Sequence, residues 1–187
     1  MATKHTADIF EILSKGQFIN SNSSDERIRK LFAAIEDNFS DLSQYFIEIN
    51  LKLERGDEYF YFSRPENRTD LERKIESAYK WIDILDFFKA HDNSFGSGYR
   101  FTPAEILVKL NVDAMLKSKL VGLRRYTKDE RLDVAIQKLI EILCREGFAD
   151  LENEVTNSYK ILASISYLEN LIMSIHIPEE INNEIPE

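Results

Sequence analysis

The side chains that most often carry chemistry are few in this chain and lie far apart in its sequence. The three histidines, His5, His91 and His176, have no acid or cysteine at the spacing of zinc ligands. The single cysteine, Cys144, lies on the flank of an apolar stripe, where cysteine behaves as a small buried hydrophobe rather than as a nucleophile. Residues 96–98, Gly-Ser-Gly, lack the third glycine and the strand-to-helix context of a phosphate-binding loop. We therefore expect no catalytic residue, no metal site, no cofactor and no enzymatic activity.

Clustered charge is the second property that could carry function, because neighbouring bases can bind phosphates. Residues 100–131 contain eight bases and four acids, although the whole chain has a formal net charge of −9. This net charge argues against a protein that binds nucleic acid by itself. The residues that we predict to contact DNA within an assembly span nine positions without an acid among them: Lys117, Lys119, Arg124 and Arg125. The alternative interpretation of the uneven charge, an ordinary solvated surface, stays open.

An aromatic row at residues 59–62 is the third candidate, because aromatic side chains are enriched where proteins bind one another. Tyr59 and Tyr61 point to one face of a strand and the two phenylalanines point to the other, so both faces are apolar. One face packs on helices. We expect the second half of the chain to cover the other face. In the alternative, that face meets a partner protein, and Tyr59 and Tyr61 are the predicted partner contacts.

A β-hairpin must position these aromatic residues. The sequence directly before them has the alternating pattern of the first strand of such a hairpin. Ile49, Leu51 and Leu53 alternate with polar residues, which is the period of a strand with one apolar face. Gly56 lies in the turn, where glycine can adopt a positive φ without a Cβ clash. The tip, residues 54–58, carries three acids and one base. DNA phosphates would repel a hairpin with this charge.

Helical patterns precede the hairpin and complete an order of helix, strand, helix, helix and hairpin by residue 62. The first helix is expected in residues 7–15 and a short strand in 17–19. The second helix follows Ser23, which has Glu26 at the capping-box position. This order of elements is that of a winged helix, a fold that usually binds DNA.

The third helix, in residues 40–50, is where a winged helix would contact DNA bases. It contains Asp41 and Glu48 and no basic residue, so phosphates would repel it. Its inward face is expected to consist of four apolar or aromatic residues: Leu42, Tyr45, Phe46 and Ile49. The order of elements thus favours a DNA-binding fold, whereas the charge argues against DNA binding by this helix.

The second half of the chain repeats this order of elements with a longer opening helix. That helix begins near Thr69 and runs to about His91. Its apolar residues repeat at a four-three-four-three spacing, which fits either a core face or a coiled-coil seam: Leu71, Ile75, Ala78, Ile82 and Leu85. We favour the core face, because the pattern covers fewer than three heptads.

Start signals and apolar stripes predict the remaining elements. Thr102, Pro103 and Glu105 form the clearest helix start in the chain. We then expect a helical segment, a helix opened by Thr127 and Glu130, a hairpin and a last helix, in residues 112–123, 127–146, 148–162 and 165–175. The predicted fold class is mainly α with small β-hairpin wings (α+β), in tandem winged helix-turn-helix domains. The predicted domains are residues 1–64 and 65–177, followed by an acidic tail, expected to be disordered, in residues 178–187.

Composition argues against a membrane-spanning or disulfide-bonded protein. No run of about 18 apolar residues exists, and charge interrupts the N-terminal segment too early for a signal peptide. A single cysteine cannot form a disulfide within the chain and fits a reducing compartment. We expect a soluble cytoplasmic protein.

The segments IFEILSKGQFI and LFAAIEDNFSDLSQYFIEINLKLERGDEYFYFSR resemble a known family. They are similar to the winged-helix subunits of bacterial condensins, the MukE and MksE (KITE) type, which has relatives in plasmid-defence complexes. The resemblance is best over residues 7–64 and continues in element order over residues 68–176. It implies a homodimeric, nucleoid-associated subunit without enzymatic activity. The implied partners are a kleisin and, through the kleisin, an SMC ATPase, with DNA contacted only within the assembly.

Two other functions remain as alternatives. A winged-helix transcriptional regulator would hold DNA through residues 100–131. A small-molecule sensor is the third hypothesis, although the sequence has no pocket signature for it.

Overall fold

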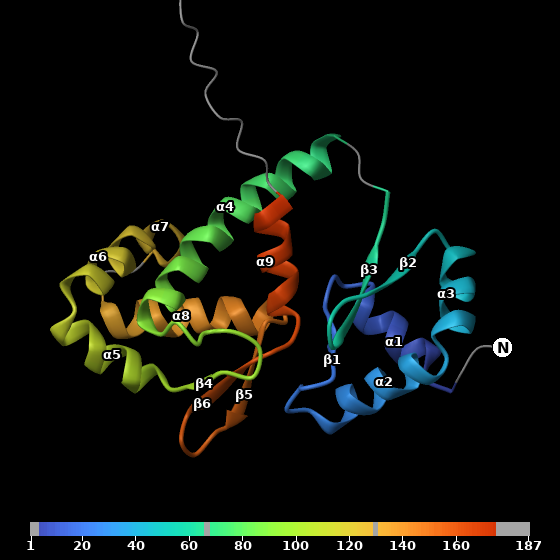
Figure 1. The fold of residues 1–187 in the computed structure, drawn as a ribbon, viewed down its shortest axis with the longest axis horizontal. Helices are drawn as coiled ribbons and strands as arrows, with labels where there is room; N and C mark the ends of the chain where they lie inside the picture. The colour runs from blue at the N-terminus through green and yellow to red at the C-terminus, as the bar shows by residue number, and fades with distance from the viewer. Residues whose placement is uncertain (1–3, 66–67, 129–130, 175–187) are drawn as a thin grey trace, which may run out of the picture.

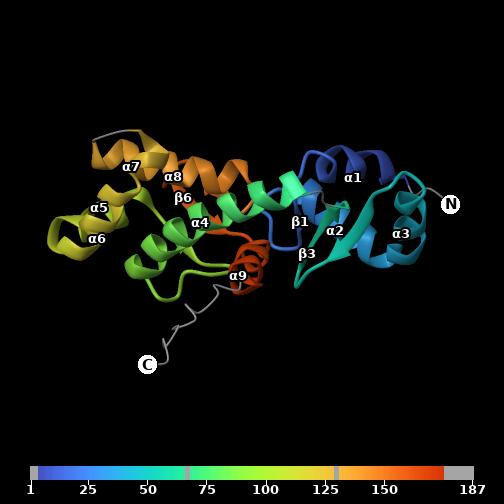
Figure 2. The ribbon, with the colours of Figure 1, turned by 90° about the horizontal axis from the view of Figure 1, so that it is seen from above.

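The computed structural model describes residues 4–65, 68–128 and 131–174. In these residues the chain is α+β, with nine helices and two small antiparallel sheets. An N-terminal unit and a C-terminal unit lie side by side along the long axis of the molecule (Figure 1 and Figure 2). Glu130, Ile175, His176 and the acidic tail in residues 178–187 lie outside the described residues.

The N-terminal unit has the predicted order of a helix, a short strand, two helices and a hairpin. Its elements are α1 (Thr6–Leu13), β1 (Ile19–Asn20), α2 (Glu26–Asp37), α3 (Phe39–Ile47), β2 (Lys52–Arg55) and β3 (Tyr59–Ser63). The sheet order is β1-β3-β2, so the aromatic strand β3 is central and pairs with both neighbours.

Two side chains that we predicted to face inward on the third helix are exposed. Leu42 and Phe46 are buried, whereas Tyr45 and Ile49 are open to solvent. For Ile49 the reason is that α3 ends before residue 49, and Asn50 adopts a left-handed φ of 60° that turns the chain toward β2. Tyr45 lies within α3, but at the edge of the buried face that Leu42 and Phe46 form. The predictions of an inward Tyr45 and an inward Ile49 were therefore wrong.

The turn of the hairpin also differs from its prediction. Glu58, not Gly56, adopts the positive φ, at 65°. A Cβ atom built on Gly56 would lie 2.0 Å from Cζ of Tyr59. Glycine is needed at position 56 because the buried Tyr59 ring lies directly against its backbone.

The predicted helix starts have mixed outcomes. The capping box of Thr102 and Glu105 is confirmed. The second helix is instead capped by Asp25, whose carboxylate accepts the Arg27 N–H at 2.7 Å. Thr127 ends a short helix rather than opening a long one, because Lys128 adopts a left-handed φ of 54°.

The C-terminal unit builds a second sheet of the same strand order and surrounds it with more helices. Its elements are α4 (Arg68–His91), β4 (Arg100–Phe101), α5 (Pro103–Val112), α6 (Ala114–Gly122), α7 (Arg124–Thr127), α8 (Leu132–Arg145), β5 (Ala149–Asn153), β6 (Ser158–Ile161) and α9 (Ile165–Ser174). The sheet order is β4-β6-β5, so the last hairpin strand is again central. No helix among the described residues is long and apolar enough to span a membrane.

Each unit has a hydrophobic cluster of its own. One cluster draws on buried residues between Ile9 and Phe60, and the other on buried residues between Trp81 and Leu168. Phe18 is an exception, because it belongs to the N-terminal unit but packs against the C-terminal cluster. The two units are thus joined by side-chain packing as well as by the chain.

Candidate partner-binding groove and basic surface

The linking loop, residues 20–24, begins with the last residue of β1, precedes α2 and attaches the N-terminal unit to the C-terminal unit. Asn20 is buried, and its Oδ1 accepts the Ser164 N–H at 2.7 Å. Asn22 donates from Nδ2 to Ile161 O at 3.3 Å and accepts the Ala163 N–H at 3.0 Å. Two amide side chains thereby satisfy backbone groups at the end of β6 and directly after it.

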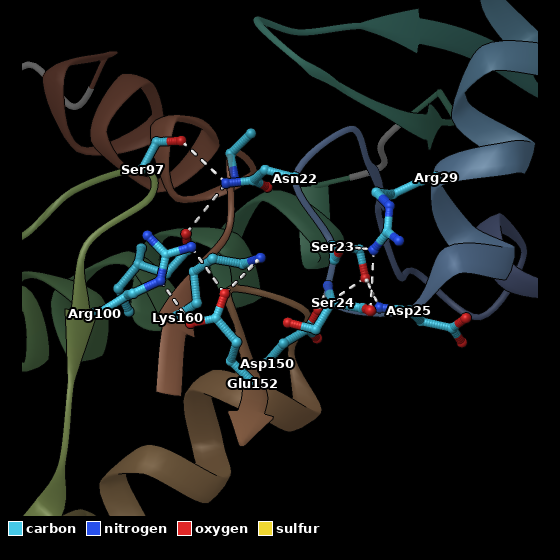
Figure 3. Close-up of polar contacts among 12 residues, drawn as sticks. Asn22, Ser23, Ser24, Asp25, Arg29, Ser97, Arg100, Asp150, Glu152 and Lys160 are labelled. Atoms are coloured by element: carbon cyan, nitrogen blue, oxygen red, sulfur yellow. Dashed lines mark hydrogen bonds and ion pairs between the residues drawn. The ribbon is translucent and has the colours of Figure 1, made fainter. Parts of the chain in front are cut away.

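Asp150 on β5 completes this attachment (Figure 3). Its Oδ2 accepts hydrogen bonds from Ser23 Oγ and from the Ser24 N–H, both at 2.8 Å. Ser23, which we predicted as a helix cap, instead donates its hydroxyl hydrogen to Asp150 of the C-terminal unit. Bonds to a charged acceptor are the stronger kind, so Asp150 is the main polar anchor of the linking loop.

A charged cluster on the sheet lies beside this anchor (Figure 3). Glu152 pairs with Arg100 at 2.6 Å and with Lys160 at 3.3 Å. The hydrogen bond from Arg100 holds the pKa of Glu152 below its ordinary value. Arg100 is therefore occupied within the chain, which sequence reasoning did not foresee.

Phe18 is the centre of an aromatic cluster that spans both units. Its ring centroid lies 5.7 Å from Tyr59 and 5.9 Å from Tyr61 in the N-terminal unit. It lies 5.3 Å from Phe148 and 5.3 Å from Tyr167 in the C-terminal unit. The C-terminal unit therefore covers this face of β3, which is the first of the two alternatives. Periodicity could not identify Phe18, because it lies in a short connection.

The two tyrosines of β3 differ in their access to solvent. Tyr59 is 3% exposed, and its burial raises its pKa to about 12. Tyr61 is half-buried, with its ring centroid 5.1 Å from Tyr167, and burial raises its pKa as well. Only Tyr61 is open to a partner in this conformation, and its contact with one stays a prediction.

A groove lies between the two units, beside Tyr61. It consists of two adjoining pockets of about 430 and 520 Å³, which share Tyr61 and Tyr167. Its apolar lining is largely aromatic, comes from both units and includes Phe18, Tyr61, Trp81, Phe148, Tyr167 and Leu171. Its charged lining has four bases and two acids: Lys15, Arg64, Arg73, Lys74, Asp70 and Glu146. The groove is thus locally basic in an acidic chain, and it suits an acidic segment with apolar anchors.

Two of the four predicted DNA contacts are paired with acids of α4. Lys119 forms an ion pair with Asp86, and Arg125 forms one with Asp83. Tyr126 also donates its hydroxyl hydrogen to Asp83 at 2.7 Å. These acids lie 33 and 42 positions earlier in the sequence, so a local charge count could not find them.

The other two predicted contacts differ in exposure. Lys117 is exposed on α6, whereas Arg124 is half-buried on α7. The four bases are therefore near one another along α6 and α7, but the field that they present is weakened by Asp83 and Asp86. Their contact with DNA stays a prediction.

The residues considered for metal binding and nucleophilic chemistry form no cluster in the part of the chain that the structure describes. No group of three or more His, Cys, Asp or Glu among the described residues could hold a metal ion. Cys144 is partly buried on α8, and burial raises the pKa of its thiol to about 11, so it is protonated at neutral pH. His91 is buried at the end of α4, where burial and Lys109 lower its pKa.

Comparison with known proteins identifies one match over most of this chain. Residues 4–172 match the family model of the condensin complex protein MksE. No curated protein matches the chain. The matched region includes both units, the linking loop, the groove and the four bases.

Proposed function

The chain belongs to the MksE family of condensin complex proteins, and we propose that it is a non-enzymatic accessory subunit of a bacterial condensin-like SMC complex. In this role it binds a kleisin, associates through the kleisin with an SMC ATPase, and forms a homodimer. It contributes to the organisation of chromosome or plasmid DNA in the cytoplasm, at the nucleoid. Each unit is a winged helix in this proposal, which the repeated strand order supports.

The groove between the units is the observation that carries the proposal of kleisin binding. Its aromatic lining supplies apolar contact area, and its basic rim supplies charge of the sign opposite to the rest of the chain. Aromatic pockets with a charged rim are where binding energy concentrates in protein interfaces. The bound element is an extended acidic segment of the kleisin with aliphatic or aromatic anchors.

Charge reversal on the rim tests this assignment. Lys15 and Arg73 are exposed, so Lys15→Glu with Arg73→Glu leaves the fold intact and lowers kleisin affinity about tenfold or more at low salt. The matched control is Lys4→Glu with Lys30→Glu, which changes the same net charge at exposed positions outside the groove. Calorimetric titration of the kleisin into each variant measures the affinity. Equal kleisin affinities of the two variants would exclude the groove as the binding site. If the wild-type chain does not bind the kleisin, the kleisin is excluded as a partner.

DNA contact within the assembly is assigned to Lys117, Lys119, Arg124 and Arg125. The transcription-regulator alternative is not favoured, because the family is one of condensin subunits and α3 carries no base. The pairing of Lys119 and Arg125 with acids further weakens the case for DNA binding by the chain alone.

A further inference from the structure

The last turns of α9 form one wall of the groove between the units. Tyr167, Leu168 and Leu171 line the first pocket, and Tyr167 also lines the second. Side chains at these spacings lie on one side of a helix. Ser174, the last residue of α9, follows Leu171 by three residues, which is about 4.5 Å of helix rise. The chain therefore leaves α9 within one helical turn of the groove lining.

The sequence that follows α9 has the properties that suit this groove. The four acids of the acidic tail, residues 178–187, are accompanied by no base: Glu179, Glu180, Glu184 and Glu187. Its aliphatic residues, Ile181 and Ile185, lie between these acids. Pro178 and Pro186 disfavour a helix at the residues before them, which favours an extended backbone. The acidic tail thus has the charge, the apolar anchors and the backbone preference of the segment that the groove accepts.

Residues 175–187 are long enough to lie along the groove. Fully extended, they span up to about 40 Å, at about 3.3 Å per residue. The two adjoining pockets of about 430 and 520 Å³ each fall within the range of about 300–1,000 Å³ that is usual for ligand sites. Because the acidic tail is attached to α9, its effective concentration at the groove is on the order of 1 mM. A weak contact is therefore enough to occupy the groove.

Two arginines of the groove can meet the acids of the tail directly. Arg64 and Arg73 are exposed, and neither forms an ion pair with another residue that the structure describes. Lys15 is paired with Glu11 at 3.0 Å, but both side chains are exposed. An exposed pair of this kind contributes little stability, so a closer acid can replace Glu11. Charge complementarity therefore centres on Arg64 and Arg73.

An exposed stripe of α4 is the other apolar surface near the end of α9. Leu71 and Ile75, which we expected in a core face, are 49% and 38% exposed, and Tyr79 is 53% exposed. Glu72 and Glu76 each follow a residue of this stripe by one position, about 100° around the helix. Acids beside the stripe repel an acidic segment, whereas the groove has two more bases than acids. The groove is therefore the better site for the acidic tail.

We propose that the acidic tail binds in the groove of its own chain and occupies it until the kleisin displaces it. The contact between tail and groove is independent of the kleisin, whereas the competition rests on the kleisin binding of the proposed function. A contact with a dissociation constant of about 0.1 mM, at an effective concentration of about 1 mM, lowers the apparent kleisin affinity about tenfold. The acidic tail is thus a built-in competitor of the partner protein.

Fluorescence anisotropy of a labelled peptide of residues 175–187 tests the contact. The receiving protein is the whole chain with the four tail acids neutralised: Glu179→Gln, Glu180→Gln, Glu184→Gln and Glu187→Gln. We expect this tail-neutralised chain to bind the peptide, and the wild-type chain to bind it more weakly because its own tail competes. Addition of Arg64→Glu with Arg73→Glu is expected to weaken peptide binding at least tenfold.

The matched control for the arginines is Lys4→Glu with Lys30→Glu, at exposed positions outside the groove. Circular dichroism melts verify that all variants stay folded. A peptide with Ile181→Asn and Ile185→Asn is expected to bind more weakly, because it lacks the apolar anchors. No binding of the unchanged peptide, or equal losses in the arginine variant and its control, would overturn the contact between tail and groove.

Calorimetric titration of the kleisin tests the competition. The tail-neutralised chain is expected to bind the kleisin about tenfold more tightly than the wild-type chain at low salt. The matched control neutralises four exposed acids outside the groove: Glu36→Gln, Asp37→Asn, Glu48→Gln and Glu154→Gln. An equal gain in this control, or no gain in the tail-neutralised chain, would overturn the competition.

The two titrations also separate this inference from the proposed function. Peptide binding without kleisin binding would support the contact between tail and groove and contradict the kleisin as partner. Kleisin binding without peptide binding would contradict the tail contact alone.

Discussion

At the scale of single residues, two tyrosines two positions apart on β3 have different environments. Tyr59 is enclosed by Phe18 and the backbone of Gly56, whereas Tyr61 borders the groove. Tyr59→Ala is expected to lower the free energy of unfolding by about 3–5 kcal/mol, the usual cost of deleting a buried aromatic ring. Tyr61→Ala is expected to cost less stability and to weaken kleisin binding. Urea unfolding together with a pull-down separates the effects, and equal stability losses would contradict this division.

The lowered pKa of His91 predicts that the stability of the chain depends on pH. Burial and Lys109 lower its pKa in the folded chain, whereas the unfolded chain has a pKa of about 6.5. The unfolded chain therefore binds more protons below about pH 6.5, so the contribution of His91 to stability is complete above that pH and is lost as the pH falls through the folded pKa.

The variant His91→Leu isolates this contribution. Nδ1 of His91 has no hydrogen-bond partner among the described residues, so an apolar replacement removes a buried polar atom as well as the titration. We expect the variant to be more stable than the wild-type chain at about pH 5, with a smaller difference at about pH 7.5. Urea unfolding at both pH values measures it. A difference that does not change with pH would contradict the assignment to His91.

At the scale of elements, the contact between the linking loop and β5 determines how firmly the units are joined. Asp150→Ala leaves Ser23 Oγ and the Ser24 N–H without their acceptor and is expected to cost about 1–3 kcal/mol. Ser23→Ala is expected to cost less, because it removes only one of the two donors. The double variant should cost less than the sum of the two single variants, since the residues share one interaction. Chemical unfolding of the four proteins measures the coupling, and strict additivity would contradict a direct bond.

Local sequence predicted the type and order of most elements, with α7 as an exception, whereas it could not predict contacts between the halves of the chain. The order in the first 62 residues and the Thr102 capping box were found as predicted, because both depend on neighbours in sequence. The use of Ser23 by Asp150 involves a separation of 127 positions, and no periodicity encodes such a partner. The sequence around Ser23 therefore has a capping signal, but in the folded chain the Ser23 hydroxyl donates to Asp150.

The candidate sites were predicted to a different extent. The four bases were found as a group from their spacing, but Asp83 and Asp86 became their neighbours only through the packing of α4 on α6 and α7. Tyr61 was identified from the aromatic row. The groove beside it was not, because Phe18, Trp81 and Tyr167 reach it from three separate segments.

At the scale of the whole molecule, the distribution of charge predicts how DNA is bound. We expect negligible binding of duplex DNA by the isolated chain near about 150 mM salt, because its net charge is −9 and two of its clustered bases are paired. Gel shifts at graded salt concentrations measure this. Tight, sequence-selective binding by the isolated chain would contradict the condensin assignment and favour a regulator.

DNA capture by the reconstituted complex is expected to depend on Lys117, which is exposed on α6. Lys117→Glu is expected to weaken DNA capture by the complex while leaving folding and kleisin binding unchanged, since Lys117 is exposed. Lys119→Gln and Arg125→Gln are better probes than charge reversals, because an acid at either position would oppose Asp86 or Asp83. Equal DNA capture by all three variants and the wild-type complex would remove this surface as a DNA contact.

The position of Phe18 has a consequence for how such a chain can be divided and recombined. This ring from the N-terminal unit packs against Phe148 and Tyr167 of the C-terminal unit, so the packing of each unit is incomplete without the other. A fragment cut before α4 would present Phe18, Tyr59 and Tyr61 to water and would be prone to aggregate. The two units should therefore be engineered as one piece: a half taken from a relative needs matching aromatic residues on the other side, whereas tags and fusions belong outside the pair.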